Sequence, residues 1–196
     1  MKIVAATRNN GKIKELQAIL SDLDIEIVSQ AEAGIDIEVE ETGDTFEKNA
    51  LIKAKSVSML CDDPVIADDS GLCVEALGGA PGVYSARYAG ENASDEEKNN
   101  KILAELGETK NRKAKFVCVT ALVFPDGYEV TATGETYGSI TYEPHGEKGF
   151  GYDPIFYSDD LKKTFADADD NEKNKVSHRA RALQALYEKL KTITDK

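Results

Sequence analysis

Cysteine is scarce in this sequence, and long apolar runs are absent from it. The 196 residues include three cysteines, Cys61, Cys73 and Cys118. Their odd number and the lack of a Cys-x-x-Cys pair argue against a disulfide framework and a zinc site, so we expect reduced, mostly buried thiols. No apolar run approaches the roughly 18–20 residues of a membrane span, and residues 1–10 have no signal-peptide core. We therefore expect a cytoplasmic chain that begins at Met1 and has no membrane partner.

Positive charge is also in short supply. The chain has 24 lysines and arginines against 36 aspartates and glutamates, a formal net charge of −12. Proteins that hold nucleic-acid backbone neutralise phosphates with Lys and Arg, so this balance argues against a nucleic-acid partner. A small phosphorylated ligand needs only a local cationic pocket or a bound metal. The length suits one domain over residues 1–196, and 41% apolar with 31% charged residues is typical of a globular protein.

Three familiar motifs for nucleotides and metals fail in this chain. A Walker loop ending at Gly11 and Lys12 would need glycine where Ala6 stands. The pattern Gly-x-Gly-x-x-Gly does not occur. A calcium loop starting at Asp167 would need glycine where Glu172 stands. These failures exclude the P-loop, the Rossmann fingerprint and the EF-hand.

Apolar periodicity predicts an α/β domain with a mixed sheet. Short strands are expected at 2–6, 25–28 and 64–67, and a long antiparallel hairpin at 115–142. Helices are expected after Lys12, after a capping-box pair of Asp44 and Glu47, after a second pair of Ser94 and Glu97, and after Ser177. The strand at 64–67 runs into the turn signal Asp-Asp-Ser-Gly at 68–71.

A candidate anion site lies at residues 7–12, between the first strand and the helix that follows it. The free N–H groups and the dipole at a helix start favour anions. Thr7, Asn9 and Asn10 offer side-chain donors, and Lys12 offers a full charge. A capped strand-to-helix turn with a solvated lysine explains the same pattern equally well.

Asp68 and Asp69 give a sharper chemical signal. Burying two adjacent carboxylates is costly unless a cation or hydrogen-bond donors compensate. Sites in α/β sheets lie at the carboxyl ends of strands, where this pair is expected. Glu41, which precedes the second predicted helix, could add a third carboxylate. Oxygen ligands suit Mg²⁺ or Mn²⁺ better than zinc. A plain turn at 68–71 is the alternative.

Two further clusters lie toward the end of the chain. Lys173, His178 and Arg179 place cations near the first turn of a helix, where they oppose its dipole, and breaking that local rule favours a functional role. An exposed basic edge is the alternative. Phe150 and Tyr152 lie beside glycines and could stack on a flat base. Aromatic packing into the core explains them as well.

Six segments together resemble the inosine triphosphate pyrophosphatase family, in order and over essentially the whole chain. They are TRNNGK at 7–12, EETGDTFEKNALIKAK at 40–55, ADDSGL at 67–72, GGAPGVYSARY at 78–88, GFGYDPIF at 149–156 and EKNKVSHR at 172–179. The resemblance implies an elongated mixed β-sheet flanked by helices, with two lobes around a central cleft. It also implies a homodimer that uses Mg²⁺, or Mn²⁺, as its cofactor. The implied reaction converts ITP, dITP or XTP to the monophosphate and pyrophosphate, which keeps these bases out of DNA and RNA.

The resemblance also implies roles for individual residues. Asp69 would be the catalytic residue, and Glu41 with Asp69 would hold the metal. The triphosphate would be bound by Thr7, Arg8, Asn9, Asn10, Gly11, Lys12 and Lys53. Other parts of the substrate would contact Ser70, Phe150, Gly151, Tyr152, Asp153, Lys173, His178 and Arg179. Within that set the Phe150 ring would stack on the base.

The resulting mechanistic hypothesis has water attacking the α-phosphorus while Lys12 and Lys53 stabilise the leaving pyrophosphate. Donors on Lys173, His178 and Arg179 would match the 6-oxygen of hypoxanthine or xanthine and disfavour the amino group of adenine. Two other functions stay open. One is a related hydrolase of modified pyrimidine nucleotides or phosphomonoesters, and the other is a purine-nucleotide sensor without catalysis.

Overall fold

The computed structural model describes residues 2–20 and 25–194. The chain divides into two compact units. The first unit comprises Met1–Asp69, Cys118–Gly134 and Arg179–Lys196, and the second comprises Ser70–Val117 and Glu135–His178. The buried apolar side chains form clusters that each lie within one unit. Each unit therefore has its own core.

Six strands form one mixed sheet in the order β2-β1-β3-β4-β5-β6. Their bounds are β1 Lys2–Ala5, β2 Glu26–Ser29, β3 Val65–Val74, β4 Lys113–Val123, β5 Glu129–Ile140 and β6 Phe156–Ser158. β1 pairs in parallel with β2 and β3, whereas β5 pairs antiparallel with β6. A short turn joins β4 to β5, and in it the Phe124 N–H donates to the Tyr128 carbonyl at 2.8 Å. The predicted mixed α/β sheet with its hairpin is confirmed.

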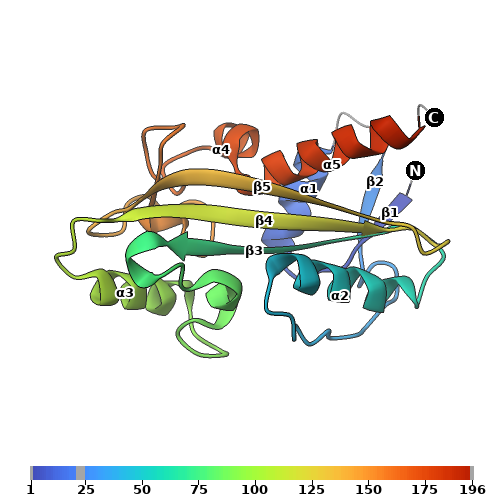
Figure 1. Cartoon of the computed structure of the whole chain (residues 1–196), viewed down its shortest axis with the longest axis horizontal. Coiled ribbons are helices and arrows are strands. Elements are labelled where there is room, and N and C mark those ends of the chain that lie inside the picture. Colours follow the sequence, from blue (N-terminus) through green and yellow to red (C-terminus); the bar gives the residue numbers. More distant parts are fainter. Residues whose placement is uncertain (1, 21–24, 195–196) are drawn as a thin grey trace. The chain divides into compact units, whose positions relative to one another are not determined.

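Helices cover both faces of the sheet in the first unit (Figure 1). They are α1 Asn10–Ile19, α2 Phe46–Ser58 and α5 His178–Thr194. Alternate residues of a strand point to opposite faces. On one face Ile3 joins a cluster with Leu16 and Leu183, from α1 and α5. On the other face Val4 joins a cluster with Ala50 of α2. The apolar run of β1 is thus explained by a strand that is buried on both sides.

The core of the second unit is rich in aromatic side chains. The Phe116 ring centroid lies 4.7 Å from that of Phe156, which lies 5.0 Å from that of Phe165. Such pairs add about 0.5–1.5 kcal/mol beyond their buried area. The helices of this unit are α3 Asp95–Leu106 and α4 Asp170–Val176. α3 packs on the aromatic core through its fully buried Ile102.

Strand β3 corrects a prediction about the acidic pair. The sequence predicts a strand over 64–67 and a turn over 68–71, but the strand continues to Val74. Asp68 and Asp69 therefore lie inside a strand, 3% and 5% exposed. The local turn signal is overridden because cations and an amide from neighbouring elements compensate these carboxylates.

The helix starts agree with the predicted caps, with three differences. α1 begins at Asn10, within the segment 7–12 that is predicted as a loop, because Asn9 is its N-cap. α3 begins with the predicted capping box. α2 is capped by Thr45, whose Oγ1 accepts from the Lys48 N–H at 3.2 Å, while Asp44 pairs with the Lys48 ammonium at 2.6 Å. The sequence pattern does not predict α4, which is too short to show an apolar period. α5 starts directly after Ser177, as predicted.

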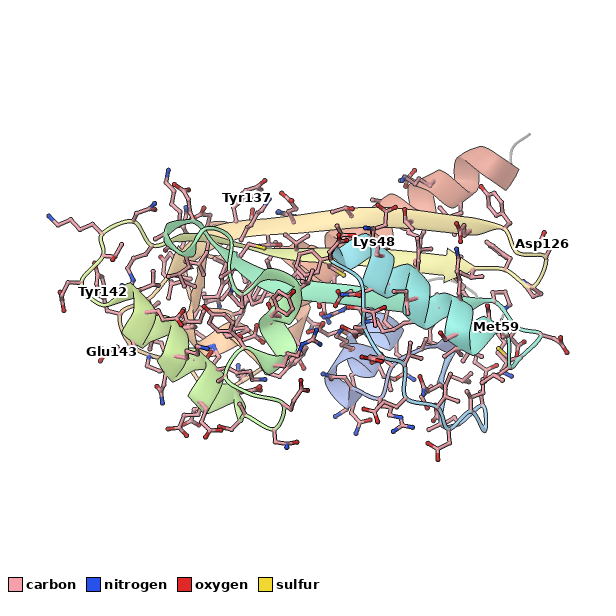
Figure 2. The ribbon with its side chains drawn as sticks, turned by 60° about the horizontal axis from the view of Figure 1, so that its bottom comes forward. Lys48, Met59, Asp126, Tyr137, Tyr142 and Glu143 are labelled. Atoms are coloured by element: carbon pink, nitrogen blue, oxygen red, sulfur yellow. The ribbon has the colours of Figure 1, made fainter. Side chains whose placement is uncertain are left out.

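Sulfur-containing side chains divide between the interior and the surface. The three cysteines are free, as predicted; Cys118 is buried, and Cys61 and Cys73 are half-buried. Met59, just past α2, is 79% exposed, and Figure 2 shows it pointing outward at the end of that helix. None of the helices within the described ranges is long and apolar enough to cross a membrane.

Candidate functional site

The two adjacent carboxylates of β3 serve different helices of the first unit. Because consecutive strand residues point to opposite faces, Asp68 meets α1 and α5, whereas Asp69 meets α2. The same alternation places Ile66 in the cluster with α1 and α5, and Ala67 in the cluster with α2. The sequence therefore builds two acidic environments from one dipeptide.

Asp68 is held by two cations. Its Oδ2 lies 3.0 Å from the Lys12 ammonium and 3.0 Å from Arg179 Nη2. The Cys118 thiol lies 3.8 Å from the same oxygen. Burial would raise the pKa of Asp68, but Lys12 and Arg179 outweigh it and hold that pKa well below its usual range. Asp68 is a carboxylate at every physiological pH.

Arg179 belongs to this group and is itself fully enclosed. Its guanidinium pairs with Glu15 of α1 as well as with Asp68. Burial alone would lower the pKa of Arg179, but the two carboxylates reverse that effect and raise it. Three elements of the first unit, α1, β3 and α5, are thus joined by one buried ionic group.

Asp69 sits in a second ionic group, with Lys53 of α2 at its centre. The Lys53 ammonium lies 2.7 Å from Glu41 Oε1 and 3.7 Å from Asp69 Oδ1. Asn49 donates to Asp69 Oδ2 at 3.1 Å. Burial and the nearby Glu41 raise the pKa of Asp69, although Lys53 opposes them. Burial would lower the pKa of Lys53, but Asp69, Asp68 and Glu41 outweigh it and raise that pKa.

Glu41 and Asp69 are the residues best suited to a divalent cation. The Glu41 carboxylate helps to raise the pKa of the nearby Asp69, and a cation would relieve that repulsion. Magnesium commonly binds through one or two carboxylates together with phosphate oxygens and water. Among the described residues, no group of three or more His, Cys, Asp or Glu side chains forms a metal site. Asp68 adds a buried Oδ1 that accepts no hydrogen bond from the described part of the chain.

The loop at 7–12 is a capped turn, and its side chains serve local structure. Asn9 is the N-cap of α1 and accepts from the Lys12 N–H at 3.1 Å, while Thr7 Oγ1 accepts from the Asn9 N–H at 3.2 Å. Asn10 and Gly11 lie in the first turn of α1. The exposed Arg8 pairs with Asp36 at 2.6 Å. Phosphate binding by this loop stays a prediction.

In the second unit the predicted substrate residues meet around Asp153. Asp153 Oδ2 accepts from the Phe150 N–H at 2.9 Å and pairs with the Lys173 ammonium at 2.7 Å. That ammonium also lies 4.7 Å from the Phe150 ring centroid. The residue Phe150 as a whole is half-buried. A Cβ on Gly149 would come within 2.1 Å of Asp153 Oδ2, which explains the glycine there.

Tyr152 and His178 are packed into the core of the second unit. Tyr152 donates its hydroxyl to the Ser85 carbonyl at 2.8 Å, and burial raises the pKa of that phenol. The His178 ring stacks on Phe116 with centroids 4.7 Å apart and planes 12° apart. For Tyr152 the core-packing alternative therefore holds. Ser70 lies half-buried in β3.

The predicted cluster of cations near the last helix is buried, which excludes the alternative of an exposed basic edge. Lys173, His178 and Arg179 are 5%, 6% and 1% exposed. Lys173 and His178 belong to the second unit and Arg179 to the first, where it joins Asp68. The boundary between the units falls between two consecutive residues, so adjacency in sequence does not place these cations in one group.

Sequence reasoning missed several residues that hold the site residues in place. Asn49 bonds Asp69, Glu15 bonds Arg179, and α3 bonds the Phe150 loop through Asp95 and Asn99. A usable signal existed for Asn49 and Asn99. Each is a polar residue on a helix face that is otherwise apolar, and a buried amide needs a partner.

The fold and these groups define an α/β protein with a partly buried acid–lysine centre in one unit and an aromatic–lysine loop in the other. The Ham1 family model matches residues 3–189, and the chain belongs to the Ham1 family. A dITP/XTP pyrophosphatase of Clostridium perfringens is 48% identical, over 98% of each chain. One of Haemophilus influenzae is 50% identical, over 96% of this chain and 98% of its own. The solved Ham1 protein of Staphylococcus aureus has a TM-score of 0.87 at 45% identity, covering 98% of this chain and 99% of its own.

Proposed function

We propose that this chain hydrolyses ITP, dITP and XTP to the nucleoside monophosphate and pyrophosphate, and so removes these nucleotides before they enter DNA or RNA. The names of the two similar pyrophosphatases support this activity. The observation that carries the proposal is the partly buried Glu41–Lys53–Asp69 group, in which a carboxyl with a raised pKa lies beside a lysine. Such a group suits proton transfer next to developing phosphate charge.

In the proposed reaction Asp69 takes a proton from the water that attacks the α-phosphorus. Its raised pKa brings it closer to the pH at which a general base works best. Asn49 fixes Asp69 Oδ2, which leaves Oδ1 as the oxygen that faces Lys53. Lys53 and Lys12 stabilise the charge that builds up on the leaving pyrophosphate.

Glu41 and Asp69 are proposed to hold Mg²⁺, or Mn²⁺ in its place. When bound, the cation would neutralise charge on the phosphate oxygens. The repulsion that Glu41 exerts on Asp69, which helps to raise the pKa of Asp69, fits that role. We further propose that Thr7, Arg8, Asn9, Asn10 and Gly11 join Lys12 in holding the triphosphate, through the N–H groups at the start of α1.

The base is proposed to stack on the half-buried Phe150, whose ring is backed by the Lys173 ammonium. Ser70, Gly151, Tyr152 and Asp153 would contribute to that side of the substrate, Tyr152 and Asp153 by shaping the loop from within. Lys173 and His178 would donate toward the 6-oxygen. Arg179 is proposed to read the base edge as well. To contact the base, Arg179 must either keep its ion pairs with Asp68 and Glu15 while it donates to the base, or break them.

The remaining expectations are proposals drawn from the family resemblance. They are a single functional domain over 1–196, a homodimer and a cytoplasmic location. Light scattering during gel filtration tests the homodimer directly. A mass near twice 21.3 kDa is expected. A mass near 21.3 kDa at micromolar concentration contradicts it.

A product assay tests the function. Purified protein with Mg²⁺ is offered ITP, XTP, GTP, ATP and dTTP separately, and monophosphate, pyrophosphate and orthophosphate are measured. We expect monophosphate and pyrophosphate from ITP and XTP, with little product from ATP. Release of orthophosphate, or equal turnover of all bases, contradicts the proposal. Tight ITP binding without turnover would instead identify a sensor.

A further inference from the structure

Two side chains of helix α3 form hydrogen bonds with one residue, Gly151, of the loop that carries Phe150. Asp95 Oδ2 accepts from the Gly151 N–H at 2.6 Å, and Asn99 Nδ2 donates to the Gly151 carbonyl at 3.1 Å. Residues four apart in a helix lie on the same face. Both backbone groups of Gly151 are therefore bonded from one helix face, and Asp95 and Asn99 together form what we call the α3 clamp.

Neither clamp side chain is the N-cap of α3. α3 starts from the capping box of Ser94 and Glu97, so Asp95 is not needed as the cap. Its second oxygen pairs with Lys98 at 2.6 Å. Asn99 is 4% exposed, and its Oδ1 accepts no hydrogen bond within the described ranges. Burying an amide whose oxygen accepts no hydrogen bond costs free energy. The hydrogen bond from Asn99 Nδ2 to the Gly151 carbonyl is the interaction that this buried amide makes.

The backbone of Gly151 needs contacts that hold it in one conformation. Its φ of +64° is in the left-handed region, which glycine adopts readily and leaves as readily. It lies between the half-buried Phe150 and Tyr152, which is anchored to Ser85. Holding both backbone groups of Gly151 fixes the direction in which the chain leaves Phe150. The clamp thus holds the backbone directly after Phe150, while Asp153 and Lys173 contact Phe150 itself.

We propose that Asp95 and Asn99 are positioning residues that hold the Phe150 ring ready to stack on the purine. This inference rests on the proposed function, because it takes the ligand to be a purine nucleotide. The clamp acts through Gly151 and Phe150, so it governs binding of the base and leaves binding of the phosphates unaffected.

Isothermal titration calorimetry with two probes, inosine monophosphate and inorganic tripolyphosphate, tests the clamp. In Asp95→Ala and in Asn99→Ala we expect inosine monophosphate to bind about five- to tenfold more weakly, the effect of losing one hydrogen bond. Tripolyphosphate should bind as in the wild type. Asn100→Ala, an exposed neighbour on the same helix, is the matched control and should change neither affinity. Asp95→Asn keeps an oxygen for the Gly151 N–H and should retain most of the affinity.

A Phe150→Ala background separates positioning from general support of the fold. If the clamp acts through the ring, Asp95→Ala and Asn99→Ala add no further loss there. The same loss in both backgrounds, or no change in inosine monophosphate binding in either clamp variant, overturns the inference. So does a wild type that does not bind this nucleotide.

Two controls keep the outcome readable. Urea unfolding checks that each variant is folded, and Asp95, whose side chain is 49% exposed, keeps the test available if Asn99→Ala does not fold. A wild type that binds inosine monophosphate but releases orthophosphate from ITP would contradict the proposed function. That result would leave the clamp standing.

Discussion

Asp68 is the carboxylate whose removal should disturb the first unit most. Asp68→Asn would leave the half-buried Lys12 and the buried Arg179 without their shared counter-charge. Breaking a buried pair in this way costs about 3–5 kcal/mol, and since Arg179 keeps Glu15 we expect about 3 kcal/mol. Urea unfolding measures it. Asp36→Asn, at the exposed pair with Arg8, should leave stability unchanged, and equal effects of the two substitutions would contradict this account.

The same residue gives a prediction about pH. Lys12 and Arg179 hold the folded-state pKa of Asp68 below its value in the unfolded chain, about 3.9. Its stabilising effect is therefore fully present above about pH 4, and it is lost as the pH falls below that value toward the folded-state pKa. Unfolding free energies of the wild type should fall more steeply below pH 4 than those of Asp68→Asn. Parallel curves would contradict the ion pairs.

The pKa of Asp69 is shifted in the opposite direction to that of Asp68, and it gives a prediction about catalysis. We expect Asp69→Asn to lower kcat for ITP by about 10²–10⁴ while ITP still binds. Burial and Glu41 move the ionisation of Asp69 upward, so the acid limb of the wild-type pH–rate profile should lie above the usual Asp value of about 3.9. A loss of less than about tenfold in kcat would remove Asp69 as the base.

At the scale of elements, β6 depends on a glycine in β5. Gly138 pairs with Ser158, and a Cβ at Gly138 would lie 2.2 Å from the Tyr157 carbonyl oxygen. Gly138→Ala must therefore displace β6, at a cost of about 1–3 kcal/mol. Ser139→Ala, the next residue along β5, is the control. Urea unfolding should show a loss for the first variant only, and similar stabilities of the two would contradict the packing.

The elements also show what local sequence could predict. The apolar periods of β1, α1, α3 and the β4–β5 hairpin are strong, because each element buries a regular face. The sequence underestimates the length of β3, because Asp-Asp-Ser-Gly has poor strand propensity and good turn propensity. Its extension to Val74 depends on Lys12, Lys53 and Arg179, which come from distant parts of the chain. Secondary-structure propensity depends on local sequence and carries no information about such distant partners.

At the scale of the whole molecule, the sequence predicts which residues belong to the candidate site better than it predicts how those residues are grouped in space. The motifs drew attention to Asp68, Asp69, Lys53 and Phe150, all of which lie in ionic or aromatic groups. They did not separate Arg179 from Lys173, because the division into two units follows long-range contacts. Residues that hold others, such as Asn99, have no charge and belong to no motif, so the one sequence signal for Asn99 is its place on an otherwise apolar helix face.

The charge of the whole chain makes one further prediction. With a net charge of −12 the protein should not bind duplex DNA at physiological salt, because the phosphate backbone demands excess Lys and Arg. Fluorescence anisotropy of a labelled duplex checks this. No change is expected at micromolar protein. Saturable binding that weakens as salt rises would contradict it.

The central claim is that water attacks the α-phosphorus at the Asp69 centre, and hydrolysis of ITP in ¹⁸O-labelled water tests it most directly. Mass spectrometry of the products should find one ¹⁸O atom in inosine monophosphate and none in pyrophosphate. Label in pyrophosphate, or orthophosphate as the labelled product, would show attack at another phosphorus and would contradict the account.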